Sequence, residues 1–164
     1  MTDQPVAIIS AGASGIGLSC ARALAAAGYR VLTLDIDVEA VAAFEAEFGE
    51  GTAVVCDVSH PAQVETAFAS LTEACDRVDV LLNNAGIAGP QQPVEEIEVE
   101  AWQSTINTDL NSLFYLTRLV IPFMKTQRSG VILNMSSSAG RYGCPLRSPY
   151  VASKWAAIGL AQTW

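Results

Sequence analysis

A tyrosine and a lysine near the end of the chain are spaced for proton transfer. Tyr150 and Lys154 lie four residues apart where a helix is expected to begin, so their side chains share one face. The ammonium of Lys154 can then stabilise the phenolate of Tyr150, which makes this tyrosine a candidate general acid or base. Three serines, Ser136 to Ser138, follow an apolar run and could supply a hydroxyl. Each signal has a structural alternative, because such pairs are common in helices and serines often end strands.

A glycine-rich segment near the N-terminus has the context of a phosphate-binding loop. Residues 10–17 read Ser-Ala-Gly-Ala-Ser-Gly-Ile-Gly, and they separate an apolar run from a helical pattern. Free backbone N–H groups and the positive end of the helix dipole can hold a pyrophosphate there, and glycine permits its close approach. A tight turn required only by the backbone is the alternative, but the strand, loop and helix in succession favour nucleotide binding.

Asp35, at the end of the second expected strand, favours NAD over NADP. A carboxylate about twenty residues beyond such a loop accepts hydrogen bonds from the adenosine ribose hydroxyls and repels a 2′-phosphate. Neither the loop nor the segment just after Asp35 contains an arginine or lysine that would bind that phosphate. A solvated strand end, or a helix cap beside Asp37, is the alternative.

Apolar runs and helical patterns alternate along the chain. Runs without polar alternation predict buried parallel strands, and the longer segments between them predict helices on both faces of the sheet. We expect strands over residues 6–10, 30–35, 52–57, 78–83 and 130–136, and helices over residues 16–27, 38–48, 62–75, 100–127 and 150–164. Pro122 should bend or shorten the long fourth helix. The predicted fold is α/β with a doubly wound parallel sheet, a three-layer Rossmann fold, and residues 1–164 form a single NAD(P)-binding domain.

Taken together, the motifs resemble those of the short-chain dehydrogenase/reductase family. The chain contains, in that family's order, Gly12, Gly15 and Gly17, then Asp57-Val58, Asn83-Asn84-Ala85-Gly86, Ser137, and Tyr150 with Lys154. The resemblance covers essentially the whole chain. It implies reversible hydride transfer between NAD and a secondary alcohol or ketone, with Tyr150 as general acid or base. Lys154 would hold the nicotinamide ribose and Ser137, chosen by its distance from Tyr150, would orient the substrate oxygen.

The resemblance also implies cofactor contacts, a substrate pocket and an oligomer. Asp57 and Val58 would hold the adenine, and the segment from Asn83 to Gly86 would line the ribose, with Asn84 and Gly86 in part structural. The expected cofactor-binding residues are Gly12, Ser14, Gly15, Ile16, Gly17, Asp35, Ile36, Asp57, Val58, Asn84, Ala85, Gly86, Tyr150 and Lys154. The loop from Gly143 to Arg147 should border the substrate, with Cys144 and Leu146 as candidates. The family forms homodimers or homotetramers through the long fourth helix and the tyrosine-bearing helix; Leu113, Leu116, Val120 and Ile121 suit that surface or the core equally.

The sequence departs from the family's pattern in two places. In the usual loop, T-G-x-x-x-G-x-G, Ser10 and Ala11 occupy the first two positions here and the glycine comes one residue later. Asp109 stands where the family usually has a catalytic asparagine that helps a water carry protons away from the lysine, so Asp109 joins the catalytic set. An ionised Asp109 should pair with Lys154 and weaken its help to Tyr150, and neither Asn107 nor Asn111 easily replaces the asparagine on an ideal helix. We expect altered or impaired turnover with NAD binding retained.

Family members continue well beyond the catalytic lysine, so we expect the chain to be part of a longer enzyme, without the family's C-terminal strands and substrate lid. The sheet should then have an exposed edge and an apolar face. Two rival functions are a non-catalytic NAD-binding or regulatory protein, motivated by Asp109 and the missing region, and an epimerase or dehydratase on the same nucleotide fold. The retained Ser137, Tyr150 and Lys154 argue against the first, and the Asn83 to Gly86 motif argues against the second.

Composition limits the partners of the protein. Of 164 residues, 51% are hydrophobic, and the net charge of -8 argues against nucleic acid or an anionic membrane as a partner. The four cysteines, Cys20, Cys56, Cys75 and Cys144, lack metal-binding spacing, so we expect no metal and mostly buried, reduced thiols. The N-terminus does not resemble a signal peptide and no run is long enough to span a bilayer. These features predict a cytoplasmic protein with a small neutral or weakly charged ligand, and the resemblance implies that this small-molecule ligand is an alcohol or ketone.

Overall fold

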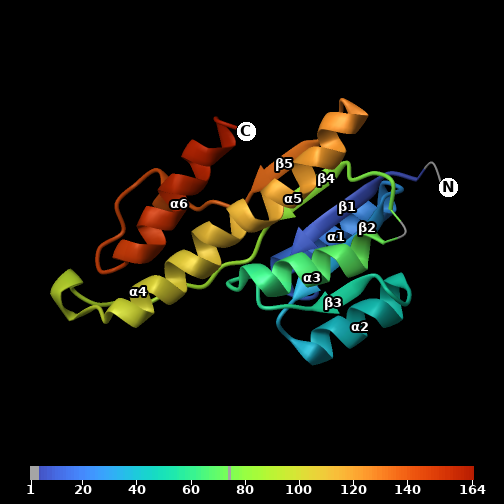
Figure 1. The fold of residues 1–164 in the computed structure, drawn as a ribbon. Helices are drawn as coiled ribbons and strands as arrows, with labels where there is room; N and C mark the ends of the chain where they lie inside the picture. The colour runs from blue at the N-terminus through green and yellow to red at the C-terminus, as the bar shows by residue number, and fades with distance from the viewer. Residues whose placement is uncertain (1–3, 74) are drawn as a thin grey trace.

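The chain folds into a five-stranded parallel sheet with helices on both faces (Figure 1). The computed structural model describes residues 4–73 and 75–164. The strand order is β3-β2-β1-β4-β5, and the strands are β1 Val6–Ser10, β2 Arg30–Asp35, β3 Ala53–Val55, β4 Val80–Asn83 and β5 Val131–Asn134. Three of them are shorter than predicted, because the apolar pattern extends beyond the residues that pair. The predicted doubly wound Rossmann fold is confirmed.

The helices of the first half lie close to their predicted positions. They are α1 Gly15–Ala26, α2 Val38–Phe48 and α3 Pro61–Thr72. Asp37 caps α2, since its side chain accepts hydrogen bonds from the backbone N–H groups of Glu39 and Ala40. Gly28 follows the end of α1 with a φ of 90°, a left-handed conformation that glycine adopts readily after a helix.

The long fourth helix is interrupted by a π-helical turn and not by its proline. It consists of α4 Val99–Ile106, the π-helical segment η2 Asn107–Asn111 and α5 Ser112–Gln127. The prediction that Pro122 shortens the helix was wrong, because α5 continues to Gln127. Pro122 and Arg118, one turn earlier, are both exposed, so water can bind the carbonyl that loses its helical partner. The π turn matters more, since Asp109 is its one buried residue.

Two apolar clusters hold the helices to the sheet. On one face, Ile8 of β1 and Leu81 of β4 pack with side chains of α3 and α5. On the other, Ile9 and Leu82 pack with side chains of α1 and α2, among them Phe44. Successive strand residues point to opposite faces, so neighbours along one strand belong to different clusters. This arrangement explains the lack of polar alternation in the central strands.

Residues proposed for an oligomer surface belong largely to the core. Leu113, Leu116 and Val120 are buried, which favours the packing interpretation. Large apolar side chains are instead exposed at Val99 and Trp102 of α4, at Phe114 of α5 and at Trp155 of α6 (Ser148–Ala161). Figure 1 shows α6 beside the α4 end of the long helix.

The last strand of the sheet is an open edge. β5 pairs with β4 on one side, and Val131 and Leu133 are about half exposed. Within this chain, the sheet therefore has the exposed apolar edge that was expected. No helix in residues 4–73 and 75–164 has the length and apolarity needed to cross a bilayer.

The cysteines are free thiols, but they are less buried than predicted. Only Cys56 is buried, whereas Cys20 and Cys75 are partly exposed and Cys144 is exposed. Burial raises the pKa of the Cys56 thiol to about 11, which keeps it protonated and unreactive at neutral pH. Cys144 lies in the irregular segment before α6, where no core covers it. Among the described residues no cluster of side chains is arranged to hold a metal ion.

Candidate active site

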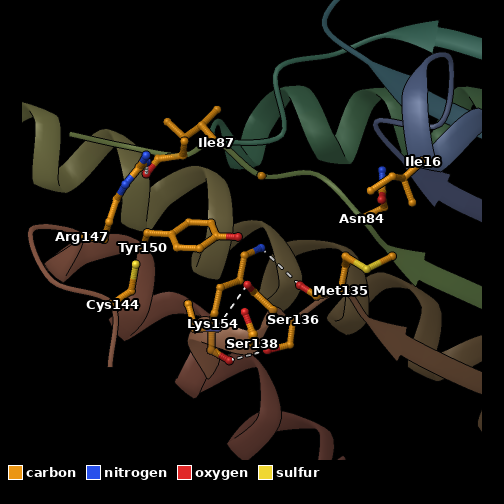
Figure 2. Close-up of a pocket in the computed structure, with 14 residues that line it drawn as sticks. Ile16, Asn84, Ile87, Met135, Ser136, Ser138, Cys144, Arg147, Tyr150 and Lys154 are labelled. Atoms are coloured by element: carbon orange, nitrogen blue, oxygen red, sulfur yellow. Dashed lines mark hydrogen bonds between the residues drawn. The ribbon is translucent and has the colours of Figure 1, made fainter. Parts of the chain in front are cut away.

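A pocket of about 640 Å³ opens where β4 and β5 end and α6 begins (Figure 2). The carboxyl ends of parallel strands are where α/β proteins bind ligands, because loops and helix N-termini meet there. The lining residues are Ile16, Asn84, Gly86, Ile87, Ala88, Met135, Ser136, Ser137, Ser138, Ala139, Cys144, Arg147, Tyr150 and Lys154. The pocket thus collects serine side chains from the segment after β5 and the tyrosine and lysine side chains from α6.

Helix α6 presents Tyr150 and Lys154 on the same side. The Lys154 ammonium lies 5.5 Å from the centre of the Tyr150 ring and donates a hydrogen bond of 3.2 Å to the carbonyl of Met135. Figure 2 shows the Tyr150 hydroxyl directed toward the end of the lysine side chain. Only 4% of Lys154 is exposed, so its charge acts on the pocket with little screening by water.

The three serines after β5 are not equivalent. Ser136 donates its hydroxyl to the carbonyl of Lys154 at 2.8 Å, which ties the end of β5 to α6. The Ser137 oxygen accepts a hydrogen bond of 3.2 Å from the N–H of Ala139, so its own hydroxyl hydrogen can still be donated to a ligand. All three line the pocket; the Ser136 hydroxyl is already engaged, and the choice of Ser137 over Ser138 still rests on sequence spacing.

Asp109 lies next to Lys154, as its sequence position suggested. It is fully buried; one carboxylate oxygen accepts a 2.7 Å hydrogen bond from the N–H of Ile87 and the other lies 3.5 Å from the Lys154 ammonium. That second oxygen has no hydrogen bond among the described residues. Burial raises the pKa of the Asp109 carboxyl, while the Ile87 N–H and the Lys154 ammonium act in the opposite direction. Asn107 and Asn111 bond to each other and do not take its place.

Gly86 lines the pocket and lies against this ion pair. A Cβ atom at this position would lie 3.1 Å from the Lys154 ammonium and 3.3 Å from an Asp109 oxygen. A side chain there would push one of the two charges aside by a few tenths of an ångström, so the tight space favours glycine. The role expected for Gly86 is therefore at least partly structural.

The glycine-rich loop is held by two side chains of β2 and by one from the residue that follows β4. The N–H of Gly12 donates to the Thr33 hydroxyl at 2.9 Å, and the N–H of Ala13 donates to Asp35 at 3.0 Å. The Asn84 amide donates to the carbonyls of Ser10 and Ala11. These bonds fix the loop. They do not use the N–H groups at the start of α1, which lack helical partners and can therefore bind an anionic group.

Close packing explains the glycine at position 17 and identifies a strained neighbour. A Cβ atom at Gly17 would collide with the carbonyl of Ala11. Ala11 itself has a φ of 51°, in the left-handed region that favours glycine. The family's first glycine is thus replaced by a residue that adopts the glycine conformation at some energetic cost.

A second pocket, of about 300 Å³, lies on the other side of the loop. It is lined by Ala11, Leu34, Asp35, Ile36, Cys56, Asp57, Val58, Ser59, Ala85, Gly86, Ile87, Ser104 and Thr108. Gly86 and Ile87 line both pockets. The residues expected for the adenosine end and those expected for the reacting end therefore flank one shared strip of backbone.

The segment before α6 contains the main residue that sequence reasoning left unassigned. Leu146 does not line the pocket; it is partly exposed with a φ of 66°, and its carbonyl accepts a hydrogen bond from the N–H of Gln92. Cys144 and Arg147 do line it. The available signal was the position of Arg147 three residues before Tyr150, at the end of the loop that was expected to border the substrate.

A family model for short chain dehydrogenases matches residues 5–164. The chain belongs to the short-chain dehydrogenase family. The 2-dehydro-3-deoxy-L-rhamnonate dehydrogenase (NAD(+)) of Sphingomonas sp. (strain SKA58) is 40% identical over 157 residues, which cover 96% of this chain and 63% of that protein. The chain thus spans about three fifths of the length of this relative.

Solved structures of this family superpose closely on the chain. NAD+-bound xylitol dehydrogenase has a TM-score of 0.90 at 31% identity, covering 97% of this chain and 63% of that one. A metagenomic short-chain oxidoreductase in complex with NADP also has a TM-score of 0.90, at 33% identity, covering 97% of this chain and 74% of that one. Structural neighbours in the family therefore include complexes with either nicotinamide cofactor.

Proposed function

We propose that the protein is an NAD-dependent dehydrogenase that interconverts a secondary alcohol and a ketone, with Tyr150 as the general acid or base. The observation that carries this proposal is the placement of Tyr150, Lys154 and Ser137 in one pocket that shares the backbone of Gly86 and Ile87 with a second pocket. Membership of the short-chain dehydrogenase family supports oxidoreductase chemistry.

The residues present fit a dinucleotide. The loop of residues 10–17 leaves backbone N–H groups at the start of α1, and a side chain at Gly17 would fill the space into which the loop folds. Asp35, Ile36, Asp57 and Val58 would hold the adenosine end. When bound, the nicotinamide supplies or accepts the hydride.

Asp35 supports the choice of NAD. It is 5% exposed, and its two oxygens accept hydrogen bonds from the N–H groups of Ala13 and Asp37, which fix the carboxylate at the edge of the smaller pocket. A negative charge held there accepts ribose hydroxyls and disfavours a 2′-phosphate. The alternative, a helix cap, belongs to Asp37 instead.

Side chains of this protein would transfer the proton to and from the substrate oxygen. During alcohol oxidation the Tyr150 phenolate accepts the proton of the substrate hydroxyl, and during reduction the phenol returns it to the ketone oxygen. The buried ammonium of Lys154 stabilises the phenolate, and the Ser137 hydroxyl donates a hydrogen bond to the substrate oxygen. Since Lys154 is held by the Met135 carbonyl, its charge stays next to the reacting oxygen.

Asp109 is the specific reason to keep a second candidate, a non-catalytic NAD-binding protein. Its carboxylate lies 3.5 Å from the Lys154 ammonium and partly neutralises the charge that Tyr150 needs. NAD binding would be retained in that case, because among the described residues Asp109 makes no hydrogen bond with the glycine-rich loop or with Asp35, which would hold the pyrophosphate and the adenosine.

Two measurements separate these functions. Calorimetry with NAD and NADP tests cofactor binding, and NADH absorbance during a screen of secondary alcohols tests turnover. We expect NAD to bind more tightly than NADP, and Tyr150→Phe to abolish turnover while preserving NAD binding. NAD binding without turnover of any alcohol would favour the non-catalytic candidate. Failure to bind either nucleotide would contradict both.

A further inference from the structure

We propose that the substrate of this pocket carries a carboxylate, which the guanidinium of Arg147 binds. The inference rests on the proposed dehydrogenase activity and specifies its substrate class, a secondary alcohol or ketone with an acid group on the same molecule.

The charges around the pocket are unbalanced. Its lining contains two cations, Lys154 and Arg147, and no acidic residue. Lys154 is matched by Asp109 behind Gly86, at 3.5 Å. Arg147 has no comparable partner: in residues 4–73 and 75–164 no carboxylate lies within ion-pair distance of it. In a chain of net charge -8, one unmatched arginine at a ligand pocket favours an anionic ligand.

The hydrogen bonds of Arg147 leave its charge available. Its two terminal nitrogens donate to the carbonyl of Ala88 at 3.0 Å and to the side-chain oxygen of Gln91 at 3.1 Å. Both acceptors are neutral. A guanidinium has five N–H donors, so three remain for a ligand.

The surrounding backbone holds Arg147 in place. The preceding residue, Leu146, has a φ of 66°, and its carbonyl accepts a 3.0 Å hydrogen bond from the N–H of Gln92. The segment before α6 is thereby joined to the segment after β4 at the same point as the Arg147 side chain. A side chain anchored on both sides loses little conformational freedom when a ligand binds.

The position of Arg147 suits the second end of a bifunctional substrate. Figure 2 shows Arg147 with Ile87 near the base of the Tyr150 ring, whereas the Tyr150 hydroxyl points the other way, toward Lys154. A substrate with its alcohol carbon at the hydroxyl can extend along the ring to the guanidinium. One arginine matches the single charge and planar shape of a carboxylate, which it binds with two parallel hydrogen bonds.

The test compares acids with their neutral counterparts in the full chain. The probes are 3-hydroxybutyrate, 4-hydroxypentanoate and 5-hydroxyhexanoate, each beside its amide, with NADH absorbance as the readout. We expect kcat/KM for the best acid to exceed that for its amide by roughly 10- to 100-fold. Arg147→Gln should remove that preference by lowering turnover of the acid only, and Arg147→Lys should keep part of it.

A nearby exposed arginine provides the control. Arg141→Gln removes the same charge from the same region, but Arg141 does not line the pocket, so the preference should not change. Equal kcat/KM for acids and amides would overturn the inference and leave the dehydrogenase intact. An equal loss for both in Arg147→Gln would overturn it too, because a purely structural role affects all substrates alike. Turnover of no probe despite NAD binding would count against both the inference and the proposed activity.

Discussion

The Ser10 hydroxyl connects β1 to the segment that follows β4, and its removal should destabilise the protein strongly. Ser10 is 1% exposed, and its oxygen accepts hydrogen bonds of 3.0 Å from the backbone N–H groups of Asn84 and Ala85. In Ser10→Ala both N–H groups lose their acceptor at a site that water reaches poorly. The glycine-rich loop and the strip of backbone between the two pockets would both be affected.

The expected loss follows from the count of orphaned donors. A buried donor left without a partner costs about 1 to 3 kcal/mol, so two cost about 2 to 6 kcal/mol. A domain is typically stable by about 5 to 15 kcal/mol, so the variant should lose a large part of its free energy of unfolding. Ser10→Thr keeps the hydroxyl and should lose much less.

Urea denaturation followed by circular dichroism measures this difference. Ser19→Ala is the matched control, because the Ser19 hydroxyl is exposed and bonds only within α1, to the carbonyl of Gly15. Its effect should stay within about 0.5 kcal/mol. A change below 1 kcal/mol in Ser10→Ala, or an equal loss in Ser10→Thr, would refute the argument from orphaned donors.

Four further predictions concern the loop and the charges. Ala11→Gly should raise the free energy of unfolding by about 0.5 to 1 kcal/mol, because it relieves the left-handed strain. The control Ala13→Gly, at a position without positive φ, should lower the free energy of unfolding. Thermal unfolding of both variants measures the difference. Asp35→Asn should reduce the preference for NAD over NADP by roughly tenfold in calorimetry, and an unchanged preference would mean that its charge does not face the ribose. Asp109→Asn should speed hydride transfer with little change in NAD affinity, and equal rates would contradict an inhibitory pairing with Lys154. Burial raises the pKa of the Asp109 carboxyl, so the native state binds the carboxyl proton more tightly than the unfolded chain does. The stability that this proton contributes is full below the ordinary carboxyl pKa. It is lost as pH rises through the raised pKa. The free energy of unfolding of Asp109→Asn relative to the native sequence should therefore increase from pH 4 to pH 7, and parallel pH curves would contradict this sign.

The sequence by itself determined the features that depend on local order. Alternating apolar runs and helical segments predicted the strands and their connections, because a buried parallel strand and its crossover helix each have their own periodicity. The strand, loop and helix around Gly12 to Gly17 located the start of α1. The spacing of Tyr150 and Lys154 predicted one shared helix face, and the structure places both side chains in one pocket.

Only the tertiary structure shows the features that depend on contacts between segments far apart in the sequence. Gly86 has little room for a side chain because the segment after β4 brings it against Lys154 and Asp109, and no local pattern records that contact. The π turn aims Asp109 inward, whereas an α-helical count alone gives its position along the chain and not its burial. Arg147 showed no signal beyond its spacing, since its charge matters only where the pocket leaves it unmatched. Periodicity is set by each residue's neighbours in the chain, but charge balance and free space are set by the sheet register that joins the segments.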